Sequence, residues 1–112
     1  MQIKLSNRGT TLIVSILGEL DHHSGEDVRN KVDGEIIKST TKNVIFDFGK
    51  VNFMDSSGIG VIMGRFKNIQ KLNGKMAVIN LSQQIRRIFE MSGLLKFIPV
   101  YDNIDSALRE FE

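Results

Sequence analysis

Short apolar runs alternate along this chain with segments whose apolar residues recur every three or four positions. The runs are rich in β-branched and aromatic residues, which is typical of buried strands, and they lie at 3–5, 10–17, 43–49, 75–81 and 97–101. Each periodic segment has the apolar stripe of a helix that packs on one side. The resulting order, β-β-α-β-α-β-α-β-α, predicts one α/β domain over residues 1–112, with a mixed β-sheet and helices packed on it.

Turn and cap residues mark where these elements begin and end. Asn7-Arg8-Gly9 is expected to join the first two strands as a hairpin, and Asn73-Gly74 to end one of the helices. Ser24 and Ser82 are suited to cap the helices that follow them. The stretch GELDHHSG at 18–25 is expected to be a polar connection after the second strand.

Composition and charge argue against several classes of function. The chain has no cysteine, which rules out disulfides, thiolate nucleophiles and cysteine-based metal sites. The 15 basic and 13 acidic side chains give a net charge of +2 and are dispersed, so nucleic-acid binding is not expected. No apolar run approaches the roughly 18 residues of a membrane span, and the N-terminus does not resemble a signal peptide. We therefore expect a cytoplasmic protein that binds no membrane.

The motif FMDSSGIG at 53–60 raises the question of serine chemistry. A serine nucleophile needs a neighbouring base and an oxyanion hole, and the exposed-elbow pattern G-x-S-x-G is absent. The only candidate bases are His22 and His23. Because adjacent strand ends could bring them near Ser56, a triad with Asp21 or Asp55 remains geometrically open.

Two other kinds of site have less support. Residues 58–64 spell G-x-G-x-x-x-G, which is one residue longer than the dinucleotide fingerprint, and no Walker lysine follows. Anion binding at this helix start would be incidental. Asp21, His22 and His23 are consecutive, and three neighbours rarely converge on one metal ion. We expect no metal, no cofactor and no enzymatic activity.

The predicted helix after Ser56 has an apolar face and a face of small side chains. By helical periodicity, the inward set is Ile59, Ile62, Met63, Phe66 and Ile69, and the outward set is Ser57, Val61, Gly64 and Asn68. A glycine within a helix costs about 1 kcal/mol relative to alanine, so Gly60 and Gly64 indicate that something packs close to the backbone. Either a neighbouring helix of the same fold or a partner protein docked on Val61 and Gly64 would explain this face.

Three motifs together resemble one known family. GELDHH at 18–23, FMDSSGIG at 53–60 and MSGL at 91–94 occur in this order, with strand–helix units between them. They resemble the anti-sigma factor antagonists, which are single STAS-type domains, and the likeness is greatest to the sporulation, anti-sigma-F branch. The resemblance covers essentially the whole chain.

This resemblance implies a binding module that phosphorylation switches off. The unphosphorylated form would bind an anti-sigma factor that is also a serine kinase, and so release a sporulation sigma factor. That kinase would phosphorylate Ser56, which directly follows the aspartate of the motif, and a metal-dependent serine phosphatase would reverse the reaction. Asp55, Ser57 and Gly58 would support the phosphorylated loop, and Asp21 matches a position that contacts the kinase.

Two alternative functions remain beside this one. The chain could be a STAS signalling scaffold whose partner is a different kinase, or an enzyme, either a hydrolase or a nucleotide hydrolase, whose turnover depends on Ser56. The second alternative predicts turnover by the purified protein, which we do not expect. A monomer is expected, because the partner would need the exposed helix face.

Overall fold

The computed structural model describes residues 2–38 and 40–111, and its element order confirms the order predicted from the sequence. One short 3-10 helix, η1, is added before the last strand. The elements are β1 (Gln2–Arg8), β2 (Thr11–Leu20), α1 (His22–Lys38), β3 (Asn43–Met54), α2 (Ser56–Lys71), β4 (Met76–Ile79), α3 (Gln83–Ser92), η1 (Leu94–Lys96), β5 (Val100–Tyr101) and α4 (Ile104–Glu110).

The sheet is mixed, as expected, and its strands lie in sequence order, β1-β2-β3-β4-β5. β1 runs antiparallel to β2, and the pairs β2–β3, β3–β4 and β4–β5 are parallel. Each parallel connection carries a helix, which is the usual way to return the chain to the same end of a sheet. The parallel strands therefore all end at one edge, where α1, α2 and α3 begin.

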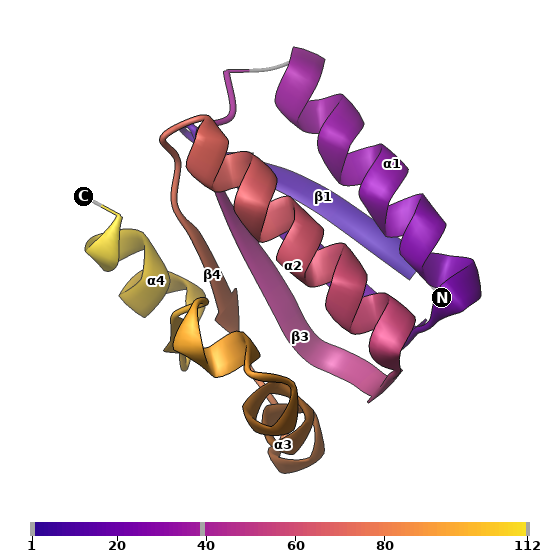
Figure 1. Ribbon diagram of the computed structural model, residues 1–112. Helices are drawn as coiled ribbons and strands as arrows, with labels where there is room; N and C mark the ends of the chain where they lie inside the picture. Colours follow the sequence, from indigo (N-terminus) through magenta and orange to yellow (C-terminus); the bar gives the residue numbers. More distant parts are fainter. Residues whose placement is uncertain (1, 39, 112) are drawn as a thin grey trace.

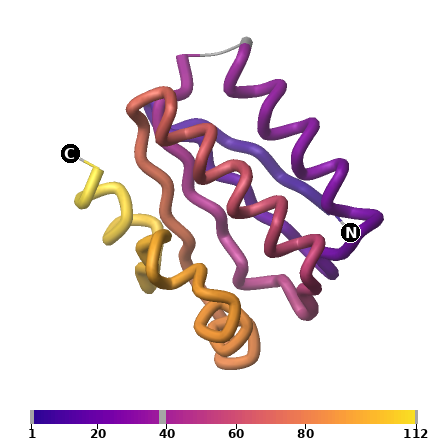
Figure 2. Tube along the Cα trace, in the orientation of Figure 1, coloured from indigo at the N-terminus to yellow at the C-terminus, as the bar shows by residue number. Residues whose placement is uncertain are grey.

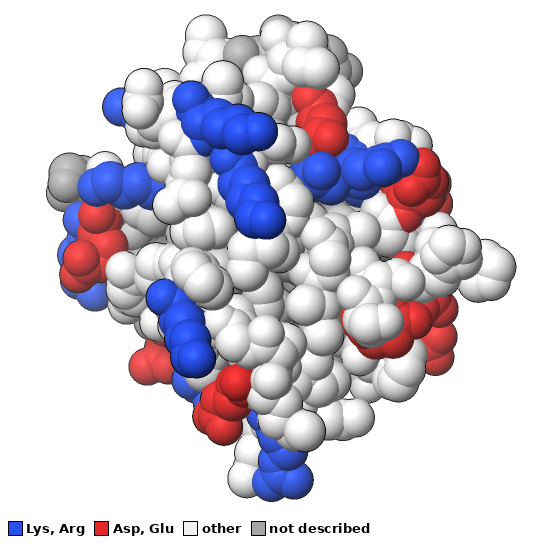
Figure 3. Space-filling view, viewed as in Figure 1, with Lys and Arg blue, Asp and Glu red and all other residues white. Residues whose placement is uncertain are grey.

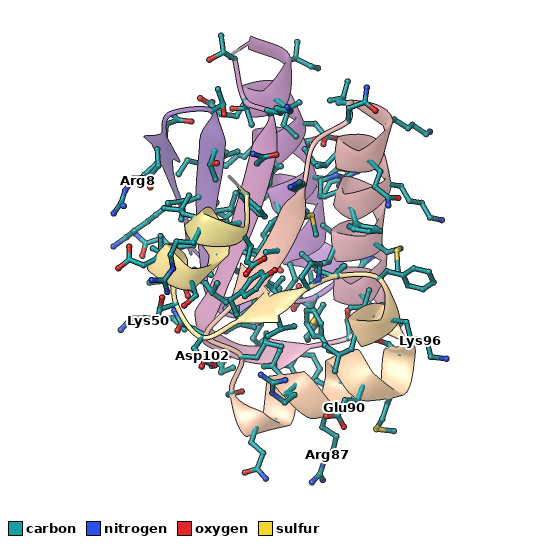
Figure 4. All side chains as sticks on the ribbon, turned by 90° about the vertical axis from the view of Figure 1, so that its left-hand side faces the viewer. Arg8, Lys50, Arg87, Glu90, Lys96 and Asp102 are labelled. Atoms are coloured by element: carbon teal, nitrogen blue, oxygen red, sulfur yellow. The ribbon has the colours of Figure 1, made fainter. Side chains whose placement is uncertain are left out.

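Helices cover the two faces of the sheet unequally. Figures 1 and 2 show α1 and α2 side by side over one face, with α3 at the end of the sheet. Figure 4 shows α4 on the side of the sheet opposite to α2. The larger core lies under α1, α2 and α3 and includes Phe46, Phe48 and Phe89. A smaller core of Ile13, Ile45, Ala77, Ile79 and Ala107 lies under α4.

Several predicted boundaries are wrong. β2 continues to Leu20 and β3 to Met54, because the two strands keep pairing through two register shifts beyond the end of β4. Ser24 does not precede α1 as its cap, since the helix already begins at His22. The predicted strand at 97–101 is limited to Val100–Tyr101.

The membrane prediction can be compared with the helices themselves. Within residues 2–38 and 40–111, none of the helices combines the length and apolar character needed to cross a bilayer.

Candidate functional site

The site forms where β2 and β3 end together. Leu20 and Met54 are register partners in this parallel pair, and the backbone N–H of Asp55 donates to the carbonyl oxygen of Leu20 at 3.3 Å. α1 and α2 start one residue after Asp21 and Asp55, respectively. Figure 1 shows the first turns of these helices next to one another. Asp21 and Ser56, far apart in the sequence, are therefore neighbours at one edge of the sheet.

Asp55 caps α2 and presents Ser56 to solvent. Its backbone is extended (φ −110°, ψ −172°), and its Oδ1 accepts a hydrogen bond from the N–H of Gly58 at 3.0 Å. Such a cap satisfies one of the free N–H groups at the helix start. Ser56 is the first residue of the helix and is exposed, whereas Ser57 is half-buried. Of the two serines, Ser56 is the more exposed residue.

The close approach of α2 to β2 requires glycine at position 58. A Cβ atom at this position would lie 2.4 Å from the carbonyl oxygen of Leu20 and 3.0 Å from the Cγ of the same residue. Because that oxygen belongs to the backbone of a paired strand, it cannot move aside easily. Only glycine lets the first turn of α2 sit this close to the end of β2, which is a physical basis for the supporting role predicted for Gly58.

Asp21 caps α1 in a reciprocal arrangement with Ser24. Asp21 Oδ1 accepts from the backbone N–H groups of His23 and Ser24, both at 3.0 Å, while Ser24 Oγ accepts from the N–H of Asp21 at 2.9 Å. This is a capping box with serine at its third helical position. The pKa of the Asp21 carboxyl is held below its usual value, mainly by the hydrogen bond from the N–H of Ser24. The Ser24 hydroxyl and His23 lower it further. Asp21 is thus a fixed negative charge at the site.

The two histidines occupy the first turn of α1 rather than a loop. Both are exposed, and their rings lie 5.8 Å apart in an edge-on arrangement. In the part of the chain that the structure describes, neither imidazole forms a hydrogen bond with Ser56 or Ser57, and no three side chains of the His, Cys, Asp or Glu type gather as a candidate metal site. The triad left open by the sequence is not formed.

The outer face of α2 differs from its prediction. Val61 packs toward α1, since a Cβ added to Gly25 would lie 3.0 Å from Val61 Cγ2. Asn68 lines a hollow together with Asp33 of α1. The outward orientation predicted for Val61 and Asn68 is therefore wrong, because α1 covers that side. Contact between Val61 and a partner protein remains a prediction. The half-buried position of this side chain does not favour it.

Gly60 and Gly64 lie on the uncovered side of α2. A Cβ at either glycine would meet no atom within 4 Å. No part of the described chain packs closely on these glycines, so the neighbouring-helix explanation does not hold for this side of α2, and contact with a partner there stays a prediction. Together with Ser56 they form a row with helical spacing, which we call the open face of α2. Gly64, predicted to bind a partner, belongs to it.

A buried arginine that we did not anticipate joins α1 to α2. Arg65 is only 6% exposed, and its Nε lies 3.0 Å from Asp33 Oδ1. The Nε–H does not point at that oxygen, so the contact is an ion pair without a good hydrogen bond, and Nη1 also has no partner. Burial lowers the pKa of Arg65, an effect that Asp33 opposes. In the sequence, Arg65 lies beside the apolar stripe of α2, and a charged side chain buried at such a position needs an opposite charge beside it. This position was the signal that could have indicated the ion pair.

The chain was compared with known families, curated proteins and solved structures. The model of the STAS domain matches residues 2–107. An anti-sigma F factor antagonist of Paenibacillus polymyxa is 41% identical over 112 residues, which are 100% of this chain and 96% of that protein. An anti-sigma-B factor antagonist of Bacillus subtilis (strain 168) is 33% identical over 92 residues, which are 78% of each chain.

Two solved structures represent both states of one related protein. The anti-sigma factor antagonist SpoIIAA in its unphosphorylated form has a TM-score of 0.85 and 29% identity, covering 97% of this chain and 95% of its own. SpoIIAA of Bacillus in the phosphorylated form has a TM-score of 0.77 and 28% identity, covering 99% and 100%. The chain belongs to the STAS domain family and, within it, to the anti-sigma factor antagonists of the SpoIIAA type.

Proposed function

We propose that this protein antagonises an anti-sigma factor that is also a serine kinase, and that phosphorylation of Ser56 ends the interaction. The unphosphorylated form binds the anti-sigma factor and releases a sporulation sigma factor. The kinase then uses ATP to phosphorylate Ser56, and a metal-dependent serine phosphatase restores the binding form. The protein acts as a cytoplasmic monomer and catalyses no reaction itself.

The position of Ser56 carries this proposal. Ser56 is an exposed residue at the first position of α2, at the edge where Asp21 also lies, and the open face of α2 begins there. A kinase can reach the hydroxyl without unfolding the domain. A partner that docks on Gly60 and Gly64 must pass directly over it.

Electrostatics explain how one phosphate can switch binding without unfolding the protein. A phosphoserine adds about −1.5 to −2 charges at pH 7. At a helix N-terminus such a charge is favourable by roughly 0.3–1 kcal/mol, so α2 should remain intact. Charges near −2 and −1 at about 6 Å repel by roughly 1.5 kcal/mol in water, and by several times more in a partly desolvated contact. Acidic groups of the partner near Ser56 would experience this repulsion, and Asp21 and Asp55 add to the negative charge that such groups meet at this edge.

Intact-mass analysis tests the switch. The purified protein is incubated with ATP and the cognate anti-sigma factor kinase, and the Ser56→Ala and Ser57→Ala variants serve as matched controls. We expect a gain of one phosphate in the wild type and in Ser57→Ala, and none in Ser56→Ala. Phosphate that is lost only in Ser57→Ala would move the site by one residue. No phosphate on any form, with a kinase active on another antagonist, would favour a STAS scaffold with a different partner.

A further inference from the structure

Basic side chains gather at the edge of the sheet at which the parallel strands begin. Three segments of the chain meet there, at 8–11, 40–43 and 71–76. All of their charged residues are basic and exposed, and they are Arg8, Lys42, Lys71 and Lys75. In the view of Figure 3, lysine and arginine side chains gather at the upper left, where Figure 1 shows α2 ending and the chain turning into β4. This edge lies opposite to the one that holds Ser56.

Backbone contacts hold these cations close together. The N–H of Lys42 donates to the carbonyl oxygen of Thr10 at 2.7 Å, and the N–H of Lys75 donates to Asn43 Oδ1 at 2.8 Å. Arg8 belongs to the same hairpin as Thr10. Among the described residues, no carboxylate forms an ion pair with any of these cations. Unpaired like charges held side by side repel one another and add nothing to the stability of the fold.

One of these cations has a structural explanation, and the others do not. Lys71 lies in the last turn of α2, where a cation is favoured by the partial negative charge of the helix end. Arg8, Lys42 and Lys75 lie at strand ends or in the turns beside them, where no helix end of their own accounts for the charge. A cluster that the fold does not need is typical of a surface that recognises an opposite charge.

A hollow of about 300 Å³ lies beside these cations, between the C-terminal halves of α1 and α2. The residues that line it are Asp33, Ile36, Ile37, Asn68, Lys71 and Leu72. Ile37 is 83% exposed and Leu72 is 57% exposed, so the hollow offers apolar surface to a ligand. Because Lys71 both lines the hollow and belongs to the cluster of cations, the two form one surface. We call this surface, with Arg8, Lys42 and Lys75, the basic hollow.

The carboxylate of Asp33 does not give the hollow a negative character. Arg65 Nε lies 3.0 Å from Asp33 Oδ1, so the charge of Arg65 offsets that of Asp33. Arg65 is 6% exposed, and its Nη1 is buried without a hydrogen-bond partner among the described residues. The charge of Lys71 is left over, in a hollow otherwise lined by apolar side chains and the amide of Asn68. A ligand that fits must combine an apolar group with a negative charge.

We propose that the basic hollow binds an acidic, amphipathic segment of a second partner protein. An apolar side chain of that segment fills the hollow, and its carboxylates face Lys71 and the neighbouring cations. The exposed apolar side chains within the cluster distinguish this surface from a nucleic-acid site, in which contacts with phosphates dominate. A concave hollow also fits a side chain better than it fits the flat surface of a membrane.

This surface is separate from Ser56 and does not rest on the proposed function. α2 has 16 residues and is therefore about 24 Å long, with Ser56 at one end and Lys71 at the other. Exposed charges interact little beyond the Debye length, which is about 8 Å at physiological ionic strength. Two partners can therefore bind at once, and a phosphate on Ser56 should leave the basic hollow unaffected.

Synthetic probes test the proposal. One fluorescein-labelled peptide combines glutamate with leucine and phenylalanine, and a second has serine in place of each apolar residue. Phosphatidylglycerol vesicles and a short DNA duplex represent a membrane and a nucleic acid. Affinity is measured by fluorescence anisotropy or, for vesicles, by co-sedimentation, the site is mapped by heteronuclear NMR, and folding is checked by thermal melting. Lys71→Glu is compared with Lys67→Glu, which makes the same change of charge at an exposed residue of α2 outside the hollow.

We expect the peptide with apolar residues to shift the amide signals of Ile37, Lys71 and Leu72. Lys71→Glu should weaken its binding about tenfold or more, whereas Lys67→Glu and Ser56→Glu should bind within about twofold of the wild type. Equal losses in the two lysine variants, equal binding of the serine peptide, or no binding of either peptide would each overturn the inference. Binding of only the vesicles or only the duplex would also overturn it, in favour of a membrane or a nucleic acid. None of these results depends on whether Ser56 is phosphorylated by a kinase.

Discussion

Replacing Gly58 by alanine should destabilise the domain, although alanine is the better helix former. The added Cβ would lie 2.4 Å from the carbonyl oxygen of Leu20, where real contacts are rarely closer than about 3 Å. Either α2 must shift away from β2 or the cap of Asp55 on the Gly58 N–H must break. Overpacking of this kind typically costs about 1–3 kcal/mol. The same shift would displace Ser56 from Asp21.

The same helix contains two controls that isolate this effect. Gly60 and Gly64 have open space where a Cβ would lie, so alanine there should stabilise the protein by about 0.4–1 kcal/mol through its better helix propensity and the less flexible unfolded chain. The expected gap between Gly58→Ala and either control is therefore about 1.5–4 kcal/mol.

Urea unfolding monitored by circular dichroism measures the gap. With an m-value of about 1–3 kcal/mol/M for a small domain, a loss of 2 kcal/mol lowers the midpoint by about 1 M. Phosphorylation of each variant by the kinase shows whether the displaced first turn is still recognised. If Gly58→Ala proved as stable as Gly60→Ala, the close approach of α2 to β2 could not be what requires glycine at this position.

Three further predictions concern charges. Asp33→Asn should destabilise the fold by roughly 1–3 kcal/mol in urea unfolding, because it leaves the buried Arg65 without a counter-ion. Breaking a fully buried ion pair usually costs about 3–5 kcal/mol, and the cost is lower here because the Asp33 side chain is 33% exposed. Arg65→Met, which removes the buried charge itself, should be better tolerated. The lowered pKa of Asp21 means that its capping contribution is complete above its unfolded pKa of about 3.9 and is lost as the pH falls through the lower folded-state pKa. The difference in unfolding free energy between wild type and Asp21→Ala should therefore shrink from pH 5 to about pH 3; a constant difference would contradict the cap. Ser56→Glu should remain folded in thermal melting but bind the anti-sigma factor at least tenfold more weakly by calorimetry, and unchanged affinity would count against electrostatic switching.

The sequence predicted the element order well because the apolar periods of this chain are unambiguous. The ends of β2 and β3 were harder to predict, because they depend on pairing between the two strands. Residues 18–20 and 50–54 are polar or mixed in character, yet the neighbouring strand keeps each segment extended. Its residue type makes Ser24 a candidate helix cap, but Asp21 occupies the cap position of α1 and the serine side chain serves as its hydrogen-bond partner. The strand ends are tertiary effects that no local pattern contains, whereas the Asp21–Ser24 cap is local.

The candidate site was predictable in its residues but not in its orientation. Ser56, Asp55 and Gly58 follow from one motif, and the structure gives Asp55 and Gly58 specific roles in placing Ser56. Which side of α2 faces a partner could not be decided from one helix alone, because it depends on where α1 lies. The buried pair of Arg65 and Asp33 was missed for the same reason, since its members come from different helices.

The local similarity of the two helix starts would explain how the proposed phosphate on Ser56 could be tolerated by the fold and still disrupt an interface. Leu20-Asp21-His22 and Met54-Asp55-Ser56 each run from a strand end, through a capping aspartate, to the first residue of a helix, in neighbouring strands. Two positive helix ends therefore meet at one edge, which favours an added anion within the domain. The two aspartates already occupy the first N–H groups of these helices, so the charge of a phosphate on Ser56 is left to face outward. A partner that approaches the open face of α2 would meet that charge before it reached Gly60, so the proposed switch would need no change of fold.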